Sequence, residues 1–316
     1  MIRYRPFQNW DPPALAEIWR TQPPLRGRVQ AVTPPLLEKH IFAKPWFDRH
    51  GLIVACDGAR PVGFAHVGFG ANRDLDDIDR SAGTICQLQV AAHERRGEIA
   101  LELLAAGEHH LRQHGAQQLF AGEQFPFTPF YVGFYGASHL PGVLASDVTA
   151  TELFAAGGYK PAISRHLYRR QLAGFRPAVD RQWMQVRRRF VISRRDEVAP
   201  DNWFEANLWA WHDWTRFVLT LPDGGEPIIS ATFWDVQPLS LSWGVQTVGL
   251  VSLDDTPEAR EAGLSSYLLG EALKHYLAEG YVEFEAQAPA GDQSLCALFQ
   301  QLGLEPYDTA ALWQKT

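Results

Sequence analysis

The sequence is poor in the residues that form disulfides or thiolate metal sites. Only three of its 316 residues are cysteine, and none of them forms a C-x-x-C pair. Cys56, Cys86 and Cys296 each lie in an apolar segment, which favours buried free thiols. The chain also lacks an apolar run of the roughly 20 residues that a membrane-spanning helix needs, and residues 1–6 lack the apolar core of a signal peptide. We therefore expect a cytoplasmic protein that does not bind a membrane.

Positive charge is scarce as well. Lys and Arg total 29 against 36 Asp and Glu, which gives a net charge of −7 at pH 7. Non-specific nucleic-acid binding depends on Lys and Arg that neutralise phosphates, so this composition argues against a nucleic-acid partner. Hydrophobic residues make up 46% of the chain and there are 11 Trp. This is enough material for the cores of two domains of about 150 residues each.

An internal repeat is the most informative feature that the sequence contains. Residues 95–104 align without a gap on residues 260–269, and the match continues in the same register with His110 on His275. Each copy follows a strand-like segment, opens with Arg and small residues, and continues into an amphipathic helix. Backbone amides and a helix N-terminus in this arrangement hold a phosphate group. The repeat therefore predicts a duplicated anion-binding fold.

Apolar periodicity predicts the same order of elements in both halves. Asp11 is the expected N-cap of a helix with Pro12 and Pro13 in its first turn. The strands expected in the first half are residues 2–5, 52–56, 61–67, 84–90 and 118–121, and a helix follows the loop to about residue 113. The strands expected in the second half are residues 183–192, 217–221, 228–236, 245–253 and 282–286, with helices at 202–211 and after residue 263.

Residues 172–177 form the expected domain boundary, which gives an N-terminal domain at 1–172 and a C-terminal domain at 177–316. The register of the repeat changes once, because residues 154–159 match residues 299–304 at a smaller offset than the loops do. The first half is therefore the longer one, and its additional residues lie within an aromatic loop at 123–148. A loop of this length either lines a substrate cleft or packs across the other domain, and we favour packing.

These features resemble the GNAT family of acyl-CoA-dependent N-acyltransferases, whose phosphate loop has the pattern Arg/Gln-x-x-Gly-x-Gly/Ala between a strand and a helix. In the second half Arg260, Gly263 and Ser265 occupy these places, and only Ser265 departs from the pattern. The resemblance covers nearly the whole chain. It implies an α+β (α/β) fold of two tandem domains, each with a mixed, mostly antiparallel sheet flanked by helices.

The resemblance also implies that acetyl-CoA is the cofactor and that the two loops are its candidate binding sites. In the first half Arg95 and Ala100 match the pattern, but Glu98 stands at the central Gly position beside Gly97. A carboxylate there repels phosphates unless it turns outward, so we favour the second loop and a catalytic C-terminal half. For the first loop a structural turn is the competing interpretation. The candidate cofactor-binding residues are Val90, Arg95, Arg96, Gly97, Ile99, Ala100, Asp255, Arg260, Glu261, Ala262, Gly263, Leu264 and Ser265.

Acyl transfer to an amine needs a deprotonated amine and benefits from a proton donor for the leaving thiolate. Many GNAT members use a Tyr near the end of a late helix as this donor, but Phe154 and Phe299 stand at the matching positions. Water, Tyr267 or Tyr307 are the alternatives, or no residue at all.

The resemblance places a general base on one of the two strands that flank the phosphate loop and its helix. The candidates are Asp254 and Glu285 in the second half and Glu123 in the first, because Gln87 and Gln89 cannot act as bases. For each carboxylate the competing interpretation is a solvated or hydrogen-bonded side chain without a catalytic role.

Three further groups of residues are interpreted structurally. The Arg-rich segment 187–195 is expected on a solvated strand face. His109, His110 and His114 are expected at the surface rather than at a metal site. Packing is favoured over an acceptor pocket for the cluster of Trp203, Trp209, Trp211 and Trp214.

The leading functional hypothesis is an N-acetyltransferase that transfers acetyl from acetyl-CoA to the amine of a small molecule. The alternative is a non-catalytic CoA-binding or scaffold protein, which the two Phe residues and Glu98 favour. A protein-acetylating or ribosome-acetylating enzyme is a third possibility. Acceptor, acyl-chain preference and oligomeric state are not encoded in any motif of the chain.

Overall fold

The computed structural model describes residues 1–177, 180–237 and 239–315. The first half contains β1 (Ile2–Pro6), α1 (Pro12–Arg20), α2 (Pro34–Leu37), η1 (Glu38–Phe42), β2 (Leu52–Asp57), β3 (Arg60–Ala71), β4 (Ile78–Val90), α3 (Arg96–Gln113), β5 (Gln118–Ala121), β6 (Val143–Leu144), α4 (Val148–Ala156) and β7 (Tyr159–Gln171). The second half contains α5 (Arg181–Arg189), β8 (Val191–Val198), α6 (Trp203–Leu208), β9 (Trp214–Thr220), β10 (Ile229–Asp235), α7 (Leu239–Trp243), β11 (Thr247–Asp254), α8 (Pro257–Glu261), α9 (Leu264–Ala278), β12 (Glu283–Pro289), α10 (Gln293–Gln301) and β13 (Glu305–Lys315).

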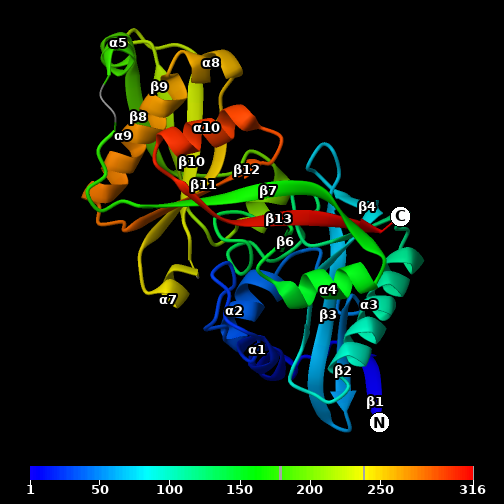
Figure 1. Cartoon of the computed structure of the whole chain (residues 1–316). Coiled ribbons are helices and arrows are strands. Elements are labelled where there is room, and N and C mark those ends of the chain that lie inside the picture. The colour runs from blue at the N-terminus through cyan, green and yellow to red at the C-terminus, as the bar shows by residue number, and fades with distance from the viewer. Residues whose placement is uncertain (178–179, 238, 316) are drawn as a thin grey trace.

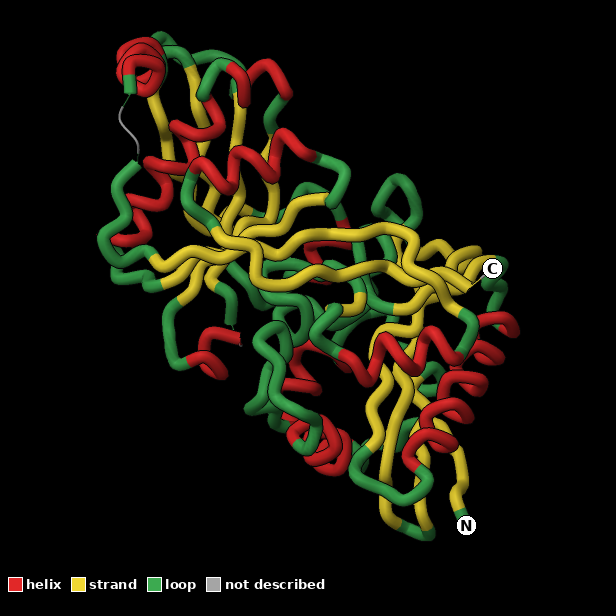
Figure 2. The backbone as a smooth tube through the Cα atoms, in the orientation of Figure 1, coloured by secondary structure: helices red, strands yellow, loops and turns green. Residues whose placement is uncertain are grey.

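The two halves share one sheet, because each half pairs with the last strand of the other. The strand order is β1-β2-β3-β4-β5-β13-β7-β12-β11-β10-β9-β8. Strand β13 of the second half lies beside β5 of the first half, and β7 of the first half lies beside β12 of the second. Figure 1 shows β7 and β13 running side by side across the molecule, and Figure 2 shows the strands continuing from one half into the other.

The sequence repeat is reproduced in the strand register. The β3–β4 pairing skips Cys86, and the β10–β11 pairing skips Val251, which is the counterpart of Cys86 in the repeat. The parallel pairings repeat in the same register: Ala82 faces Gln118, and Thr247 faces Glu283. Both parallel pairings are short, so β4 diverges from β5, and β11 from β12, before the phosphate loops. The expected α+β architecture with a mixed, mostly antiparallel sheet is confirmed.

The long aromatic loop packs across the second half, as expected. The indole of Trp234 donates a hydrogen bond to the carbonyl of Ser138 at 2.8 Å. The Gln287 amide donates to the carbonyls of Gly136 and His139 at 2.6 and 3.0 Å. Trp209 and Trp214 are buried in the same core as the aromatic residues of this loop. The packing role expected of the Trp cluster is confirmed for these two, whereas Trp203 and Trp211 are largely exposed.

The strand predicted at residues 183–192 is wrong. Residues 181–189 form α5, and β8 begins only at Val191. The Asp180 side chain caps α5 by accepting from the amide of Trp183 at 2.7 Å. Trp183 and Val186 stand at helical spacing and bury one face of the helix. Residues 187–189 therefore lie in the last turn of a helix, where their positive charge interacts favourably with the helix dipole. Of this Arg-rich group, only residues 194 and 195 lie on a strand.

Asp11 stands at the N-cap position of α1, as expected, but its side chain makes no capping hydrogen bond. The Asp11 carboxylate binds the Arg5 guanidinium at 2.7 and 2.8 Å and the amide of Gln8, and it caps no amide of α1. Among the described residues, no helix combines the length and the apolar character needed to cross a membrane. The predicted domain limits stay a prediction, since one sheet runs through both ranges.

We expect Leu312→Ala to destabilise the first half although Leu312 belongs to the last strand of the chain. Leu312 is fully buried and packs with Ala82 and Phe120. Truncation of a buried Leu to Ala should lower the free energy of unfolding by about 2–5 kcal/mol, measured by urea denaturation. Its cross-strand partner Ile163 is 49% exposed, so Ile163→Ala is the control and should cost less than about 1 kcal/mol. Equal losses in the two variants would contradict the strand exchange.

Candidate active site

Arg260 in the second phosphate loop is tied to two carboxylates. Its guanidinium lies 2.9 Å from Asp255 and 3.0 Å from Asp292, and the pKa of Arg260 is raised, chiefly by the hydrogen bond with Asp255. Ser265 also donates its hydroxyl to Asp255, whose side chain is completely buried. Asp292 is the N-cap of α10. These ion pairs occupy the space between the loop and α10, so Arg260 and Ser265 already have partners.

The second loop is also covered from outside by α5. Gly263 starts α9 with a φ of +72°, and a Cβ atom there would lie 2.8 Å from the Gln182 side chain. Gln182 donates to the Glu261 carbonyl at 2.9 Å. The amides of residues 264–266 have no acceptor among the described residues. A polar cavity of about 420 Å³ remains beside them, lined by Asp180, Gln182, Trp183, Arg260, Glu261, Gly263, Ser266, Gln301 and Leu302.

In the first loop, the Arg at the equivalent position points to solvent instead of into the protein. Arg95 turns outward and binds Glu98, with Nε 2.7 Å from Oε2, and both side chains are roughly half exposed. Their hydrogen bond lowers the pKa of Glu98. The Glu98 carboxylate therefore turns outward, which is the arrangement that is compatible with a bound phosphate.

Backbone amides at the start of α3 remain available. The amides of Arg96 and Ile99 donate within the turn, to His93 and Arg95. In the described part of the chain, no acceptor is found for the amides of Gly97 and Glu98. A Cβ atom on Gly97 would meet nothing within 4 Å. Two free amides, an open approach and the positive end of the long helix α3 form a site suited to phosphate.

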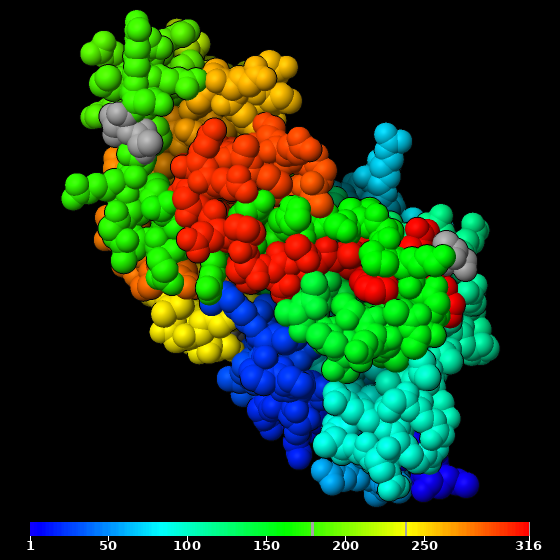
Figure 3. Space-filling model, viewed as in Figure 1, coloured from blue at the N-terminus to red at the C-terminus, as the bar shows by residue number. Residues whose placement is uncertain are grey.

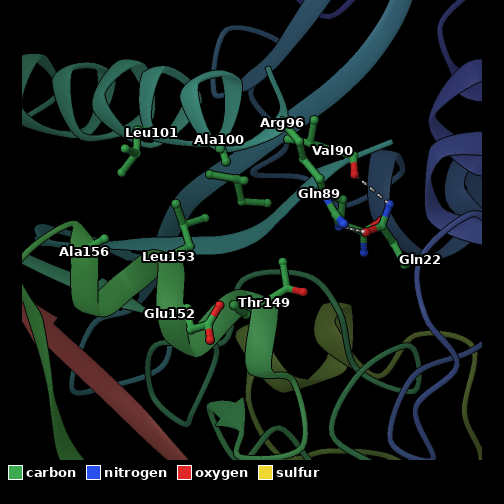
Figure 4. Close-up of a pocket in the computed structure, with 13 residues that line it drawn as sticks. Gln22, Gln89, Val90, Arg96, Ala100, Leu101, Thr149, Glu152, Leu153 and Ala156 are labelled. Atoms are coloured by element: carbon green, nitrogen blue, oxygen red, sulfur yellow. Dashed lines mark hydrogen bonds between the residues drawn. The ribbon is translucent and has the colours of Figure 1, made fainter. Parts of the chain in front are cut away.

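A cleft opens directly from these amides between α3, β4 and α4 (Figure 4). Its volume is about 400 Å³. The cleft exists because β4 and β5 pair only up to Ile85 and Ala121 and then separate. Figure 4 shows Ala100 and Leu101 pointing from α3 toward Leu153 of α4. The lining residues are Gln22, Leu88, Gln89, Val90, Arg96, Gly97, Ala100, Leu101, Thr149, Ala150, Glu152, Leu153 and Ala156.

The cleft continues inward into a second cavity of about 230 Å³, which shares Leu88, Gln89 and Thr149 with it and reaches Arg28 and Asp147. Most of the cofactor-binding candidates in the first half line the cleft, namely Val90, Arg96, Gly97 and Ala100. Arg95 pairs with Glu98 instead, and Ile99 is fully buried in the core.

Residues at equivalent positions explain why the surroundings of the two loops differ. Asp255 is the counterpart in the repeat of Val90, which is apolar and lines the open cleft. The buried charge of Asp255 draws Arg260 inward, whereas its counterpart Arg95 turns to solvent. The one sequence signal of this difference is the acidic pair at residues 254 and 255 before the second loop.

Neither catalytic candidate of the second half faces an open cleft. Glu285 is buried against Arg26 of the first half, with Nη2 2.8 Å from Oε1, and it accepts from the Tyr307 hydroxyl at 3.2 Å. Burial raises the pKa of Glu285 to about 7. Asp254 is exposed at the end of β11 and accepts from the Ser230 hydroxyl at 2.8 Å. Glu285 and Tyr307 therefore belong to the seam between the halves.

Two other candidates have structural surroundings. Glu123 accepts from the amides of Phe130 and Tyr131 at 2.6 and 2.9 Å and so orders the long loop. Burial raises the pKa of Glu123 to about 7. Tyr267 packs against Trp183 with ring centroids 4.8 Å apart. Neither Glu123 nor Tyr267 lines the cleft of the first half.

The inner end of the cleft has a hydroxyl that the sequence pattern does not single out. Tyr135, from the long loop, donates to Asp147 at 3.2 Å and accepts from the amide of Leu144 at 3.0 Å. It borders a small cavity with Cys86, Gln87, Leu88 and Phe154, where the splay of β4 and β5 begins. Burial raises the pKa of Tyr135, so the hydroxyl keeps its proton. Only its place in the additional aromatic segment distinguishes it in the sequence.

Comparisons with known proteins agree on the fold. Residues 13–135 match the acetyltransferase (GNAT) family. A tandem GNAT protein from the clavulanic acid biosynthesis pathway is similar over 99% of this chain and 98% of its own, with 16% identity and a TM-score of 0.66. A GCN5-related N-acetyltransferase from Sphaerobacter thermophilus is similar over 99% and 95%, with 15% identity and a TM-score of 0.64.

A third similar structure is a GCN5-related glucosamine N-acetyltransferase region of a fungal multi-domain β-N-acetylglucosaminidase. It matches 99% of this chain and 38% of its own, with 14% identity and a TM-score of 0.69. No curated protein sequence matches significantly. At these identities the likeness shows the fold, and it extends over both halves.

We expect Glu285 to make stability fall with rising pH. Its pKa of about 7 in the folded protein exceeds the value of about 4.3 for an unfolded Glu. A raised carboxyl pKa contributes stability that is complete below about pH 4.3 and is lost as the pH rises through about 7. The difference in unfolding free energy between the wild type and Glu285→Gln should therefore fall over this range, measured by urea denaturation.

Asp254→Asn is the control for this prediction, because it removes an exposed carboxylate from the neighbouring strand and should change the pH profile little. A difference that instead grows with pH would mean that attraction to Arg26 outweighs burial.

Proposed function

We propose that this chain is a tandem GNAT protein whose first half binds acetyl-CoA and acetylates the amine of a small molecule. The GNAT family match at residues 13–135 and the fold likeness over both halves support this proposal. The observation that supports this choice of half is the cleft that starts at Gly97, whose amide has no acceptor among the described residues, and extends between α3, β4 and α4. The fold supports an acyl-CoA-dependent N-acetyltransferase in general. The choice of the first half, the small-molecule acceptor and the roles of individual residues are what we propose beyond this.

Acetyl-CoA fits the cleft as an elongated substrate with a charged and a reactive end. The amides at the start of α3 bind its pyrophosphate. The pantetheine arm lies along Leu88–Val90, with Ala100 and Leu153 as apolar walls. The thioester then points toward the splay of β4 and β5, where the cavity of about 20 Å³ beside Gln87 and Tyr135 has to widen to admit it. This placement orients the thioester at the inner cavity, from which the amine approaches.

The transfer forms a C–N bond to the amine and breaks the C–S bond of the thioester. We assign Tyr135 as the proton donor to the leaving thiolate, because Phe154 at the usual position has no proton to give. The proton that the amine nitrogen sheds passes to water and restores Tyr135. Arg28 lies with its guanidinium 5.8 Å from the Tyr135 ring and is paired with Asp147, so its charge offsets part of the repulsion between that carboxylate and the transient tyrosinate.

The second half has a supporting role in this proposal. The positive charge of Arg260 in its loop is neutralised by Asp255 and Asp292. Its last strand, β13, completes the sheet of the first half. The expectation from the loop pattern, a catalytic C-terminal half, competes with this assignment. A non-catalytic CoA-binding protein remains the alternative function, and Phe154 and Phe299 favour it.

Gly97→Glu should abolish CoA binding without unfolding the protein. A Cβ atom at Gly97 meets no atom within 4 Å, so the backbone tolerates the change. The added carboxylate repels the phosphates of CoA, so we expect the CoA affinity to fall at least about 100-fold, measured by isothermal titration calorimetry. Ala262→Glu is the matched control, because exposed Ala262 is the equivalent position in the second loop. Loss of binding in Ala262→Glu alone would assign the cofactor to the second half.

Tyr135→Phe should lower kcat about 100-fold or more and leave the affinity for CoA unchanged. The change removes the proposed donor, and release of CoA thiol with a panel of amines that includes glucosamine measures the rate. Tyr159→Phe is the control, because Tyr159 is a buried tyrosine of the same half with its ring 5.7 Å from Phe154. Equal rates in the two variants would remove Tyr135 from the mechanism. Thermal stabilisation by CoA without turnover of any amine would instead favour the binding-only alternative.

A further inference from the structure

The C-terminal end of α3 has a separate cluster of polar side chains. His110 and His114 lie one turn apart on the same face of the helix, and Asp48 from the turn before β2 faces them. One ligand atom from each residue lies within 4.8 Å of the others. At about 1.5 Å per residue, the histidines lie roughly 21–27 Å along α3 from its first residue, Arg96. The cluster is therefore remote from the proposed acetyl-CoA site.

Hydrogen bonds orient two of the three side chains toward a common point. His114 Nδ1 lies 2.8 Å from the carbonyl oxygen of His110. Because a carbonyl can only accept, Nδ1 carries the proton and Nε2 of His114 presents its lone pair. The amide of His50 donates to Asp48 Oδ1 at 2.8 Å, while Oδ2 lies 2.9 Å from His110 Nε2. An imidazole tied through one nitrogen to a carbonyl is the usual form of a histidine metal ligand.

The spacing and the surroundings suit a zinc ion. Zinc takes nitrogen and oxygen ligands at about 2.0–2.2 Å in a tetrahedron, which requires ligand atoms about 3.3–3.6 Å apart. Rotation of the exposed Asp48 and His114 side chains closes the remaining gap from the observed 4.8 Å limit. A cavity of about 390 Å³ borders all three residues and leaves room for water as the fourth ligand. Arg80 also borders this cavity, with its guanidinium 5.5 Å from the Phe69 ring.

The duplicated position in the second half has a different arrangement. His275 and Glu279 are the counterparts of His110 and His114 in the repeat. They lie 3.1 Å from each other, and Arg194 contacts both. The Arg194 guanidinium already fills this position, so within the described ranges the metal-ligand pattern occurs in the first half alone.

We propose that Asp48, His110 and His114 bind one Zn²⁺ ion, which fastens the C-terminal end of α3 to the turn before β2. The helix spacing alone favours surface positions for these histidines, and Asp48 lies far from both of them in the sequence. Only the fold brings the carboxylate to the two rings. The proposal is independent of the acetyl-transfer site.

Zinc titration of the full chain without a polyhistidine tag tests the site. We expect one Zn²⁺ per chain with a Kd below about 10 µM, measured in competition with a chromophoric chelator, and visible absorption bands of a tetrahedral ion when Co²⁺ replaces zinc. His114→Ala should weaken binding at least about tenfold. The exposed position of His114 makes this variant tolerable to the fold, and its thermal melting without metal should match the wild type.

His109→Ala is the matched control, because His109 is an exposed neighbour on the same helix outside the cluster. It should retain the affinity of the wild type, and Asp48→Ala should lose it like His114→Ala. Absence of stoichiometric binding would overturn the proposal, as would equal affinities in His114→Ala and the wild type. An equal loss in His109→Ala would overturn it too, since it would indicate general capture by surface histidines.

Discussion

Reciprocal pairing of the last strands is the constraint on which the structure depends. The short strand β5 has β4 on one edge, and β13 from the opposite end of the chain covers the other. Without β13 this edge would expose unpaired backbone groups. In the space-filling view of Figure 3 the C-terminal segment, in red, runs across the middle of the molecule between segments drawn in green. The slot beside α3 and α4 therefore rests on a sheet that neither half completes alone.

The polar contacts along the seam follow from this pairing. Arg26 reaches Glu283 and Glu285 of β12, and its guanidinium stacks 4.3 Å from the Trp243 ring. Lys44 donates to two carbonyls at the end of α6 at 2.6 Å each, and burial lowers the pKa of Lys44 to about 7. Buried polar groups of this kind are costly unless they are paired. The seam therefore favours one arrangement of the halves.

The two repeated loops differ in charge at several positions, among them Val90 and its counterpart Asp255. Val90 leaves an apolar wall in the first half, whereas its counterpart Asp255 introduces a buried carboxylate that Arg260 must neutralise. A buried charge without a partner costs several kcal/mol, so the pairing of Arg260 takes priority over its exposure to a ligand. Arg260, which matches the family pattern, is thus bound by Asp255 and Asp292 instead of being free to contact a ligand. Glu98, which departs from the pattern, points to solvent with Arg95.

The sequence by itself determined the duplication, the two loops and most elements, because these depend on periodicity and on short-range patterns that recur at one fixed offset. It misplaced α5, where three consecutive Arg obscured the helical spacing of Trp183 and Val186. Only the tertiary structure decided that β13 closes the first half, that Arg260 turns inward, and that Asp48 meets His110. Each of these outcomes depends on contacts between distant segments, and no local pattern records which buried charge or open edge lies nearby.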